Sequence, residues 1–423
     1  MNEKCLIIGI PYIKNAENER VKLCADITFD DKCKTMFFEV DKEYKEYLCT
    51  ELSDAFITGI FYFASYNQFN IKCLGPASER LIYQLNQYYL PTIHKMDSEH
   101  YKMIKVEAQD LVNIEFDTNY AVGTAASGGV DSFYSILSHH RNNRYEDYNL
   151  THVIVANLFN KYDEEENVRK KYDILLEKAE TISTELNLPI IKMYTNHHEF
   201  LFRDYVEFYS LRICSYAFAL QKLFKVYLIS SGTMFQDSNF KSTDSTDYDV
   251  FNTPMASTNN LTFYMSGGEK GRVEKIEYIS KYDVVKKNLH VCTLNDKKNC
   301  SECDKCMRTM VALDLVGDLQ EYKSIFDLSK YAKRKNMYLG KVISQAKDNV
   351  YGVLNTELIQ EAKKRRYKIP NISYIYAWVL WTPYIFIKDL LKKSALIKKI
   401  YFKLKIDYLI YGKEKAEIYR FGK

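Results

Sequence analysis

Apolar residues recur at every second position near the start of the chain, as they do in a strand with one buried face. This alternation covers Val21, Leu23, Ala25, Ile27 and Phe29, with mostly polar neighbours between them. Further strands are predicted at 5–12, 35–40 and 70–74, and helical stretches at 42–65 and 78–89. Residues 1–112 are therefore predicted to form a small α+β domain.

From Asn119 onward, short apolar segments alternate with longer helical patterns. The pattern predicts strands at 120–122, 152–158, 189–194, 226–230 and 275–279, with helices from Phe133 and at 163–186, 199–224 and 280–288. The polar stretch 236–260 lacks periodicity and is interpreted as a loop. Such alternation is typical of a parallel, doubly wound, Rossmann-like α/β sheet, here assigned to residues 113–317. Ligands of such sheets bind at the carboxyl ends of the strands.

Residues 318–423 are predicted to be a helical region. The stretch from Ile372 to Ile387 is strongly apolar and contains Trp378 and Trp381, but it is shorter than the roughly 20 residues of a membrane span. A lysine-rich amphipathic stretch follows at 388–405. A basic amphipathic helix beside an aromatic anchor can lie on an anionic bilayer, so peripheral membrane contact through 372–405 is one interpretation. A hairpin closing the protein's own core, or a dimer interface, is the other.

The composition changes this picture little, except for the cysteines. Of the 423 residues, 47% are hydrophobic and 27% are charged, and the net charge of +4 does not by itself indicate a nucleic-acid partner. The first 14 residues do not resemble a secretory leader. Four of the ten cysteines lie within fifteen residues, which favours a metal site in a reducing compartment. We therefore expect a cytoplasmic protein, with homo-oligomerisation also expected.

The stretch with the strongest chemical signal is Ser127-Gly128-Gly129-Val130-Asp131-Ser132, between a predicted strand and a predicted helix. The first turn of a helix carries unpaired N–H groups and partial positive charge, and glycines let this backbone approach an anion closely. The hydroxyls of Ser127 and Ser132 add donors, and Asp131 is a candidate for holding a metal ion or fixing the loop. The segment is therefore predicted to bind phosphate, although a plain Gly-Ser turn has the same local features.

This loop lacks the GK[ST] ending of the P-loop and the GxGxxG of dinucleotide-binding folds. It resembles the SGGxDS loop of the N-type ATP pyrophosphatases, the PP-loop superfamily, whose fold is of the adenine nucleotide alpha hydrolase type. The resemblance implies cleavage of ATP to AMP and pyrophosphate with Mg2+, so that a substrate oxygen becomes adenylated. It also implies that Ser127 to Ser132 grip the β- and γ-phosphates.

Cys292, Cys300, Cys303 and Cys306 have the spacing C-x7-C-x2-C-x2-C. Four thiolates satisfy tetrahedral Zn2+, and short CxxC turns place two sulfurs on one ion. Structural zinc is the favoured interpretation. An iron–sulfur cluster and free or redox-active thiols are the alternatives.

Together the two motifs resemble the 7-cyano-7-deazaguanine synthases, which combine an ATP pyrophosphatase fold with a four-cysteine zinc site. The resemblance covers Asn119 to Gly317, and the flanking regions and the stretch after Gly232 depart from the family. It implies that Leu158 lies against the adenine, that Gly232 helps to enclose the nucleotide, and that Lys281 faces the phosphates. Leu158 and Gly232 are equally compatible with ordinary polar loops, and for Lys281 an ordinary surface position is the favoured interpretation. The implied catalytic residues are Ser127, Asp131, Ser132 and Lys281.

The resulting hypothesis is an AMP-forming ligase. A carboxylate or carbonyl-type oxygen of a small molecule or modified base is activated by ATP, and ammonia or another nucleophile then displaces AMP. The departures favour a substrate different from that of the family. A tRNA-thiolation enzyme and a non-catalytic nucleotide-binding scaffold are the competing hypotheses; the first needs a basic RNA-binding face, which the charge does not indicate.

Overall fold

The computed structural model describes residues 4–141, 144–157, 164–200, 205–242, 244–346 and 352–393. Contacts within the chain define two compact units, Met1–Asp327 and Leu328–Lys423. All of the candidate site residues predicted from the sequence fall within the first unit. The predicted boundary at residue 112 falls inside that unit, between strands that belong to one sheet.

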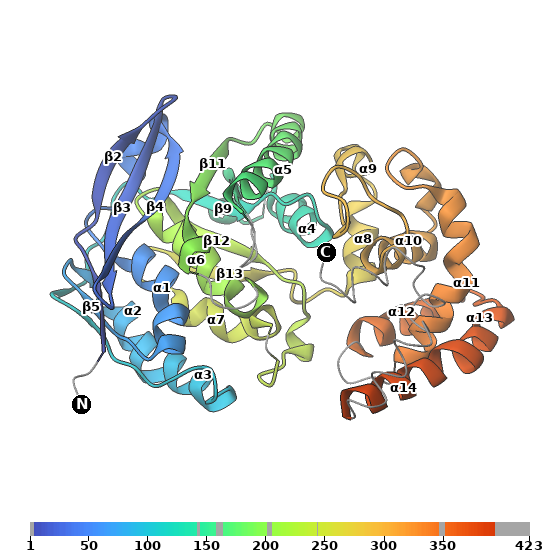
Figure 1. Ribbon diagram of the computed structural model, residues 1–423. Coiled ribbons are helices and arrows are strands. Elements are labelled where there is room, and N and C mark those ends of the chain that lie inside the picture. Colours follow the sequence, from blue (N-terminus) through green and yellow to red (C-terminus); the bar gives the residue numbers. More distant parts are fainter. Residues whose placement is uncertain are drawn as a thin grey trace. The chain divides into compact units, whose positions relative to one another are not determined.

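The first unit is built on one long mixed sheet, drawn from blue to yellow in Figure 1. Its parallel part has the order β13-β12-β9-β10-β11. These strands span Thr262–Ser266, Phe224–Ser230, Ala121–Ala125, His152–Ala156 and Ile190–Thr195. The predicted α/β class with a mostly parallel sheet is thus confirmed.

The N-terminal strands extend this sheet. β11 pairs antiparallel with β4, with Thr195 opposite Phe38, and the order continues through β3, β1, β5 and β7, while β2 pairs with β3. β1 to β5 span Cys5–Ile8, Tyr12–Ala16, Arg20–Phe29, Lys32–Asp41 and Asn70–Cys73, and β7 spans Val106–Ala108. β6 (Ala77–Ser78) and β8 (Leu111–Val112) form a separate small pair. The alternation predicted at 21–29 is confirmed by β3, whose Val21, Leu23, Ala25 and Ile27 are buried.

The strand order determines where a ligand can enter. The chain enters the parallel part at β9, proceeds outward to β10 and β11, and then returns to place β12 on the other side of β9. The connections after β9 and β12 therefore leave toward opposite faces, which opens a crevice between the carboxyl ends of these two strands. The Ser127–Ser132 loop follows β9 directly, and Gly232 follows β12.

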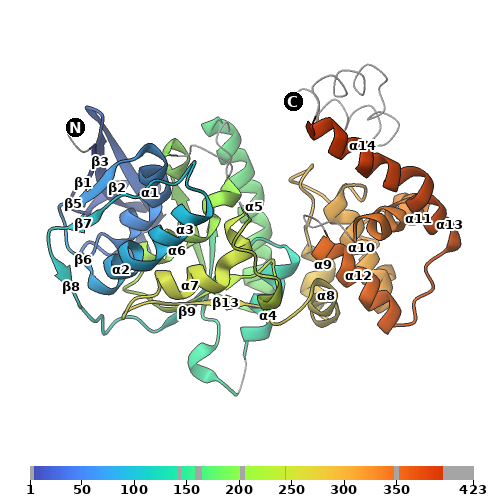
Figure 2. The ribbon, with the colours of Figure 1, turned by 90° about the horizontal axis from the view of Figure 1, so that it is seen from below.

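Helices cover both faces of the sheet. α6 (Tyr209–Ala219) packs on one face, where Phe218 meets Phe263 of β13, and α1 (Asp54–Asn67) packs on α6 (Figures 1 and 2). α4 (Val130–His139) lies on the other face, beside Leu228 and Tyr264. Strand neighbours point to opposite faces, so Phe263 and Tyr264 mark the two sides. The remaining helices of this unit are α2 (Glu79–Gln84), α3 (Leu90–Met96), α5 (Glu165–Leu186), α7 (Asp249–Ala256), α8 (Arg272–Ile279), α9 (Asp283–Asn288) and α10 (Asp304–Val316).

Several predicted elements were wrong or misplaced. Residues 275–279 are not a strand but part of α8, because Val273, Ile276 and Ile279 bury one helical face and Glu274 accepts a hydrogen bond from the Gly271 N–H. The edge strand is β13 instead. The stretch 236–260 contains α7, and the helices predicted from 42 and 199 begin later, at Asp54 and Tyr209, after 3-10 turns.

The second unit is helical where it is described, as predicted. It contains α11 (Leu328–Gln345), α12 (Gly352–Lys364), α13 (Asn371–Tyr376), a π-helical turn at Ala377–Trp381 and α14 (Thr382–Lys393). Trp381 is buried and its indole N–H donates to the Met337 carbonyl at 2.9 Å. Large apolar side chains on the other sides are exposed, namely Ile372, Tyr374, Ile375, Trp378, Val379 and Phe386.

No helix in the described part of the chain is long and apolar enough to cross a bilayer. The exposed apolar side chains of α13 and α14 are compatible with both interpretations of 372–405, and residues 394–405 lie outside the described part. Peripheral membrane contact and homo-oligomerisation therefore stay predictions.

Candidate nucleotide-binding site and metal centre

The Ser127–Ser132 loop is closed by the hydroxyl of Ser132. This hydroxyl donates to the Ala125 carbonyl at the end of β9 (2.7 Å) and accepts from the Ser127 N–H (3.0 Å). The Ser127 hydroxyl in turn accepts from the Gly129 N–H at 3.4 Å. These bonds fold the loop back on the start of α4 and hold its backbone in one conformation.

Gly128 is the residue that allows the bend. Its φ of +73° lies in the left-handed region, which a side chain would disfavour. Its carbonyl accepts from the His290 N–H at 2.9 Å, which ties the loop to the segment leading into the cysteines. Gly129 is the N-cap of α4 and provides no side-chain cap, so the positive end of this helix is available to an anion.

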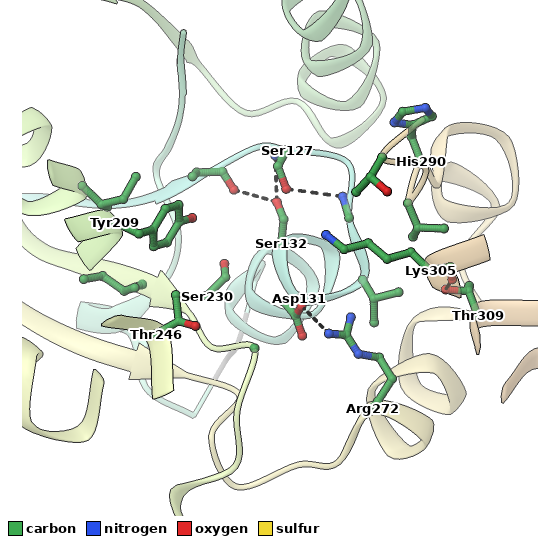
Figure 3. Close-up of a pocket in the computed structure, with 18 of the residues that line it drawn as sticks. Ser127, Asp131, Ser132, Tyr209, Ser230, Thr246, Arg272, His290, Lys305 and Thr309 are labelled. Atoms are coloured by element: carbon green, nitrogen blue, oxygen red, sulfur yellow. Dashed lines mark hydrogen bonds and ion pairs between the residues drawn. The ribbon is translucent and has the colours of Figure 1, made fainter. Parts of the chain in front are cut away.

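This loop opens onto a cavity of about 480 Å3 at the crevice between β9 and β12. The cavity is lined by the loop itself, by the end of β12 and the residues after it, and by segments from α6, α8, α10 and the cysteine region. Figure 3 shows the serines of the loop, Asp131 and Arg272 around the start of α4. The dimensions are those of a site for a nucleotide-sized ligand.

One side of the cavity is fixed by an ion-pair network below the loop. Both oxygens of Asp131 are paired: Oδ2 with Arg272 at 3.0 Å and Oδ1 with Lys275 at 3.1 Å. Lys275 is 2% exposed and also donates to the Ser231 carbonyl at 2.6 Å. Burial by itself would raise the pKa of Asp131, but the two cations lower it below its usual value. The network joins the loop, α8 and the end of β12.

Further positive charge comes from the start of α10. Lys305, Arg308 and Thr309 line the cavity, and Lys305 extends toward the loop (Figure 3). Burial and the neighbouring Arg272 and Arg308 lower the pKa of Lys305. Lys305 and Arg308 make no ion pair with the described carboxylates, so their charge favours an anionic ligand, which would restore the pKa of this lysine.

The other side of the cavity is apolar and aromatic. Tyr209 and Ile213 of α6 face Tyr227 and Ile229 of β12, all on the face of the sheet opposite α4. Ser230, next along β12, lines the cavity with a buried hydroxyl that makes no hydrogen bond among the described residues. A flat aromatic base is the kind of group that such a surface buries well.

The four cysteines predicted as a metal site come together. Their sulfurs lie within 4.8 Å of one another, with Cys300 and Cys306 3.9 Å apart and Cys292 and Cys303 4.0 Å apart. A regular tetrahedron with Zn–S bonds of about 2.3 Å has edges of roughly 3.8 Å, so the spacing fits a zinc ion. All four are free thiols rather than disulfides.

The surroundings of the sulfurs also suit a bound metal. Backbone N–H groups of Leu294, Cys303 and Cys306 point at sulfurs, at 3.2 to 3.5 Å, and such donors stabilise thiolates. Asn299 braces the segment by accepting from the Val291 N–H and donating to the Leu289 carbonyl. Cys303 is the N-cap of α10, so the cluster fixes the helix that carries Lys305 and Arg308.

No known family model matches the chain, and no curated protein or solved structure matches it either.

Most of the predicted site residues meet at the cavity. Ser127, Gly129, Val130, Asp131, Ser132 and Gly232 line it, as does Cys292 of the metal centre, and Gly128 shapes the loop behind them. Leu158 lies outside the described residues. Lys281 is exposed in the turn between α8 and α9 and is not among the lining residues. The lysine that reaches the loop from this region is Lys275, six residues earlier.

The sequence reasoning assigned no cavity role to Arg272, Lys275 or Lys305. The position of Lys275 beside the loop could not be predicted, because its segment has the pattern of a strand in the sequence analysis. A usable signal existed for Lys305, which lies between Cys303 and Cys306 of the candidate metal centre and therefore had to lie beside the cluster.

Proposed function

We propose that this chain is an AMP-forming, ATP-dependent ligase of the PP-loop type, with an adenine nucleotide alpha hydrolase-like fold. It would cleave ATP to AMP and pyrophosphate and thereby activate a carboxylate or carbonyl-type oxygen for attack by ammonia or another amine. The observation that carries the proposal is the juxtaposition of the Ser127–Ser132 loop with Arg272, Lys305 and Arg308 around one cavity.

The two sides of the cavity suggest how ATP would lie. The β- and γ-phosphates would occupy the loop and the start of α4, facing the cations, and the base would contact the Tyr209 and Tyr227 side. The α-phosphorus would then lie between these sides, where an acceptor molecule can approach it. The stabilisation is electrostatic and comes from donors and cations that are already in place.

In the first step a substrate oxygen attacks the α-phosphorus, a new O–P bond forms, and the bond to the bridging oxygen breaks as pyrophosphate leaves. In the second step the nitrogen attacks the activated carbon and loses a proton to solvent, the C–O bond breaks, and AMP leaves with the electron pair. Lys305 and Arg308 would neutralise the charge that develops on the leaving pyrophosphate. This scheme requires no covalent enzyme intermediate.

Of the two roles that the sequence left open for Asp131, its pairing favours fixing the loop over holding a metal ion. Both of its oxygens are taken by Arg272 and Lys275. Asp244 also lines the cavity, and the Thr246 N–H and hydroxyl both donate to one of its oxygens, at 3.0 and 2.8 Å. Asp244 would be the candidate residue to hold an Mg2+ ion, which would supply charge neutralisation to the phosphates.

The zinc site fits a structural role. Four protein sulfurs complete a tetrahedral zinc and leave no open position. Of the described residues that line the cavity, Cys292 is the one cysteine, and it belongs to this cluster. The proposal therefore favours adenylation over sulfur transfer.

The test is ATP binding and pyrophosphate release with candidate acceptors, in wild type and in Ser127→Ala, Asp131→Ala and Arg272→Ala. We expect all three variants to lose at least tenfold in turnover, since each removes a group beside the phosphates. Lys281→Ala is the matched control: the cavity geometry predicts wild-type activity, whereas the family resemblance predicts a loss.

Two results would overturn the proposal. Unchanged turnover in all three cavity variants would reject the site. Calorimetry with no ATP binding by the zinc-loaded wild type would favour the nucleotide-fold scaffold instead. Absorption bands of an iron–sulfur cluster in anaerobically purified protein would reopen the thiolation hypothesis.

A further inference from the structure

A second cavity, of about 440 Å3, lies on the α4 side of the sheet, between α4 and the edge strand β13. Its floor includes Leu228, which also lines the first cavity, so the two spaces adjoin through β12. The proposed ATP chemistry uses none of the other residues in its wall. Its wall carries a carboxylate and several aromatic rings, whereas the wall of the first cavity carries Arg272, Lys305 and Arg308.

Four tyrosine rings contribute to this second wall, those of Tyr134, Tyr145, Tyr148 and Tyr264. Tyr148 and Tyr264 stand edge to face with ring centroids 6.0 Å apart at the mouth, where both are exposed, and the buried Tyr134 lies deeper. Tyr145 also lines the cavity, but the Arg144 guanidinium already lies over its ring at 5.4 Å. The accessible ring faces are therefore those of Tyr148 and Tyr264. Such faces carry negative electrostatic potential and attract cations.

The polar groups in the wall accept hydrogen bonds. Glu269 supplies a carboxylate, one oxygen of which accepts from the Tyr134 hydroxyl at 2.7 Å. His139 Nδ1 lies 3.0 Å from both the Ser135 carbonyl and the Ser138 hydroxyl, and a neutral imidazole keeps one of its nitrogens as an acceptor. Burial lowers the pKa of His139, which keeps the ring neutral at pH 7.

Ser266 contributes a hydroxyl to the wall of this cavity. Its Oγ is buried and makes no hydrogen bond among the described residues. Ser266 is two positions after Tyr264 on β13, so its side chain points to the same face of the sheet. A buried hydroxyl without a partner is costly, and a ligand that reached it would offset that cost.

No lysine or arginine is among the described residues lining this cavity. Two described cations lie near its rings: Arg144, 5.4 Å from the centre of the Tyr145 ring, and Lys275, 5.9 Å from the centre of the Tyr134 ring. The Lys275 ammonium group already contacts Asp131 and the Ser231 carbonyl. The wall thus combines one carboxylate, neutral acceptors and open π faces. The carboxylate disfavours a small anion here, whereas an organic cation would find several partners.

We propose that this cavity between α4 and β13 binds an organic ammonium ion, with Glu269 as its counter-ion and the Tyr148 and Tyr264 rings against its alkyl or N-methyl groups. The site stands apart from the proposed ATP chemistry, since neither its residues nor its ligand class depends on a nucleotide. It gives the molecule adjacent pockets of opposite charge preference.

The experiment titrates zinc-loaded full-length protein with butylammonium and with tetramethylammonium, by calorimetry and by ligand-observed NMR. Butanol and tert-butanol are the uncharged analogues, and acetate is the anionic control. We expect saturable binding of at least one ammonium ion, with the matching alcohol binding about tenfold more weakly or worse, because it lacks the charge that Glu269 and the rings recognise.

Three variants assign the binding to this cavity. Glu269→Gln retains an oxygen for the Tyr134 hydroxyl and should weaken ammonium binding about tenfold, and Tyr264→Ala should weaken it by a similar factor. Glu146→Gln is the matched control, because Glu146 is an exposed carboxylate on the same side that does not line the cavity. Thermal unfolding and ATP binding of each variant show that the fold and the first cavity are intact.

The proposal is overturned if neither ammonium ion binds saturably, if the alcohols bind as well as the ions, or if Glu269→Gln and Tyr264→Ala both bind like wild type. ATP binding that persists in Glu269→Gln while ammonium binding falls would support it. Loss of ATP binding in Arg272→Ala leaves it untouched, so failures of the two proposals are distinguishable.

Discussion

The two sides of the phosphate end of the cavity are built in different ways. The loop is six consecutive residues, Ser127 to Ser132, closed by hydrogen bonds that span at most seven positions. The opposing cations come from α8 and α10, and the Lys275 to Asp131 contact joins residues 144 positions apart. The conformation of the loop is therefore determined by neighbouring residues in the sequence. The cations of α8 and α10 reach their positions only when the whole unit has folded.

This difference predicts how each side fails. Changes in the loop should alter the local backbone while the rest of the unit stays folded. The side formed by Arg272, Lys305 and Arg308 is called the cation wall. Changes in the cation wall should disturb the fold beyond the cavity, because α10 is held at its start by the cysteine cluster and α8 by the Asp131 network. Variants of the two sides should therefore differ in how far the damage spreads, and loss of the cysteine cluster should spread furthest.

Removal of the metal should have the largest effect. Cys303→Ser, or chelation of the wild type, is expected to release zinc and to unfold the start of α10, because structural zinc sites contribute folding energy directly, on the order of 10 kcal/mol in small zinc domains. ATP affinity should then fall by more than about a hundredfold as Lys305 and Arg308 lose their positions. Zinc content by mass spectrometry, thermal unfolding and calorimetry measure the three consequences.

Cys33→Ser is the control for that experiment, since Cys33 is an exposed cysteine of β4, away from the cluster. A metal-free protein that still bound ATP with wild-type affinity would show that the cation wall does not depend on the cluster.

Lys275→Met should have the next largest effect. It removes a 2% exposed lysine and leaves Asp131 with Arg272 alone, and breaking a buried ion pair on one side costs about 3 kcal/mol of unfolding free energy. The double variant with Asp131→Asn should recover part of this loss, because the remaining carboxylate charge is gone. Urea unfolding of the four proteins in the cycle gives the coupling free energy.

Lys270→Met is the matched control, because the Lys270 side chain is 43% exposed and its contact to Glu274, at 3.8 Å, is a surface pair. If Lys275→Met were no more destabilised than Lys270→Met, the network would not support the cavity as argued.

The same local-versus-distant contrast explains what could be predicted from the sequence. The loop and the cysteine cluster were found because their residues are close in sequence and their chemistry needs fixed spacing. The parallel sheet followed from the alternation of apolar segments. Arg272 and Lys275 could not be placed, because their role depends on β13, an edge strand with the exposed Tyr264 whose pattern is weak. The joining of β4 to β11 was not predictable either, since the edge pairing between distant strands leaves no periodic signal.

On the local side, Ser132→Ala should have a moderate effect. The buried hydroxyl of Ser132 closes the loop by donating to the Ala125 carbonyl and accepting from the Ser127 N–H. Its loss leaves two backbone groups without this partner and should cost about 2 kcal/mol of unfolding free energy. ATP affinity should drop while zinc content stays at one ion per chain, which is the signature of a local failure.

Ser138→Ala is the control, because Ser138 lies on the same helix and its hydroxyl contacts only neighbouring helical groups. Zinc loss in Ser132→Ala would contradict the separation between the loop and the wall.

Gly128→Ala should have the smallest effect on stability, and it tests directly whether the left-handed backbone at this position holds the loop. At φ +73° a side chain costs about 1 kcal/mol, and the nearest atom to the added carbon would be the Asn288 carbonyl oxygen at 3.6 Å, an ordinary contact. The cost is therefore conformational rather than steric. Gly129→Ala, at φ −81° with a similar 3.5 Å contact, should unfold with a free energy closer to that of wild type. If the two variants were equally destabilised, the left-handed bend would not be what holds the loop, and the local specification of this side of the cavity would have to come from the serine hydroxyls alone.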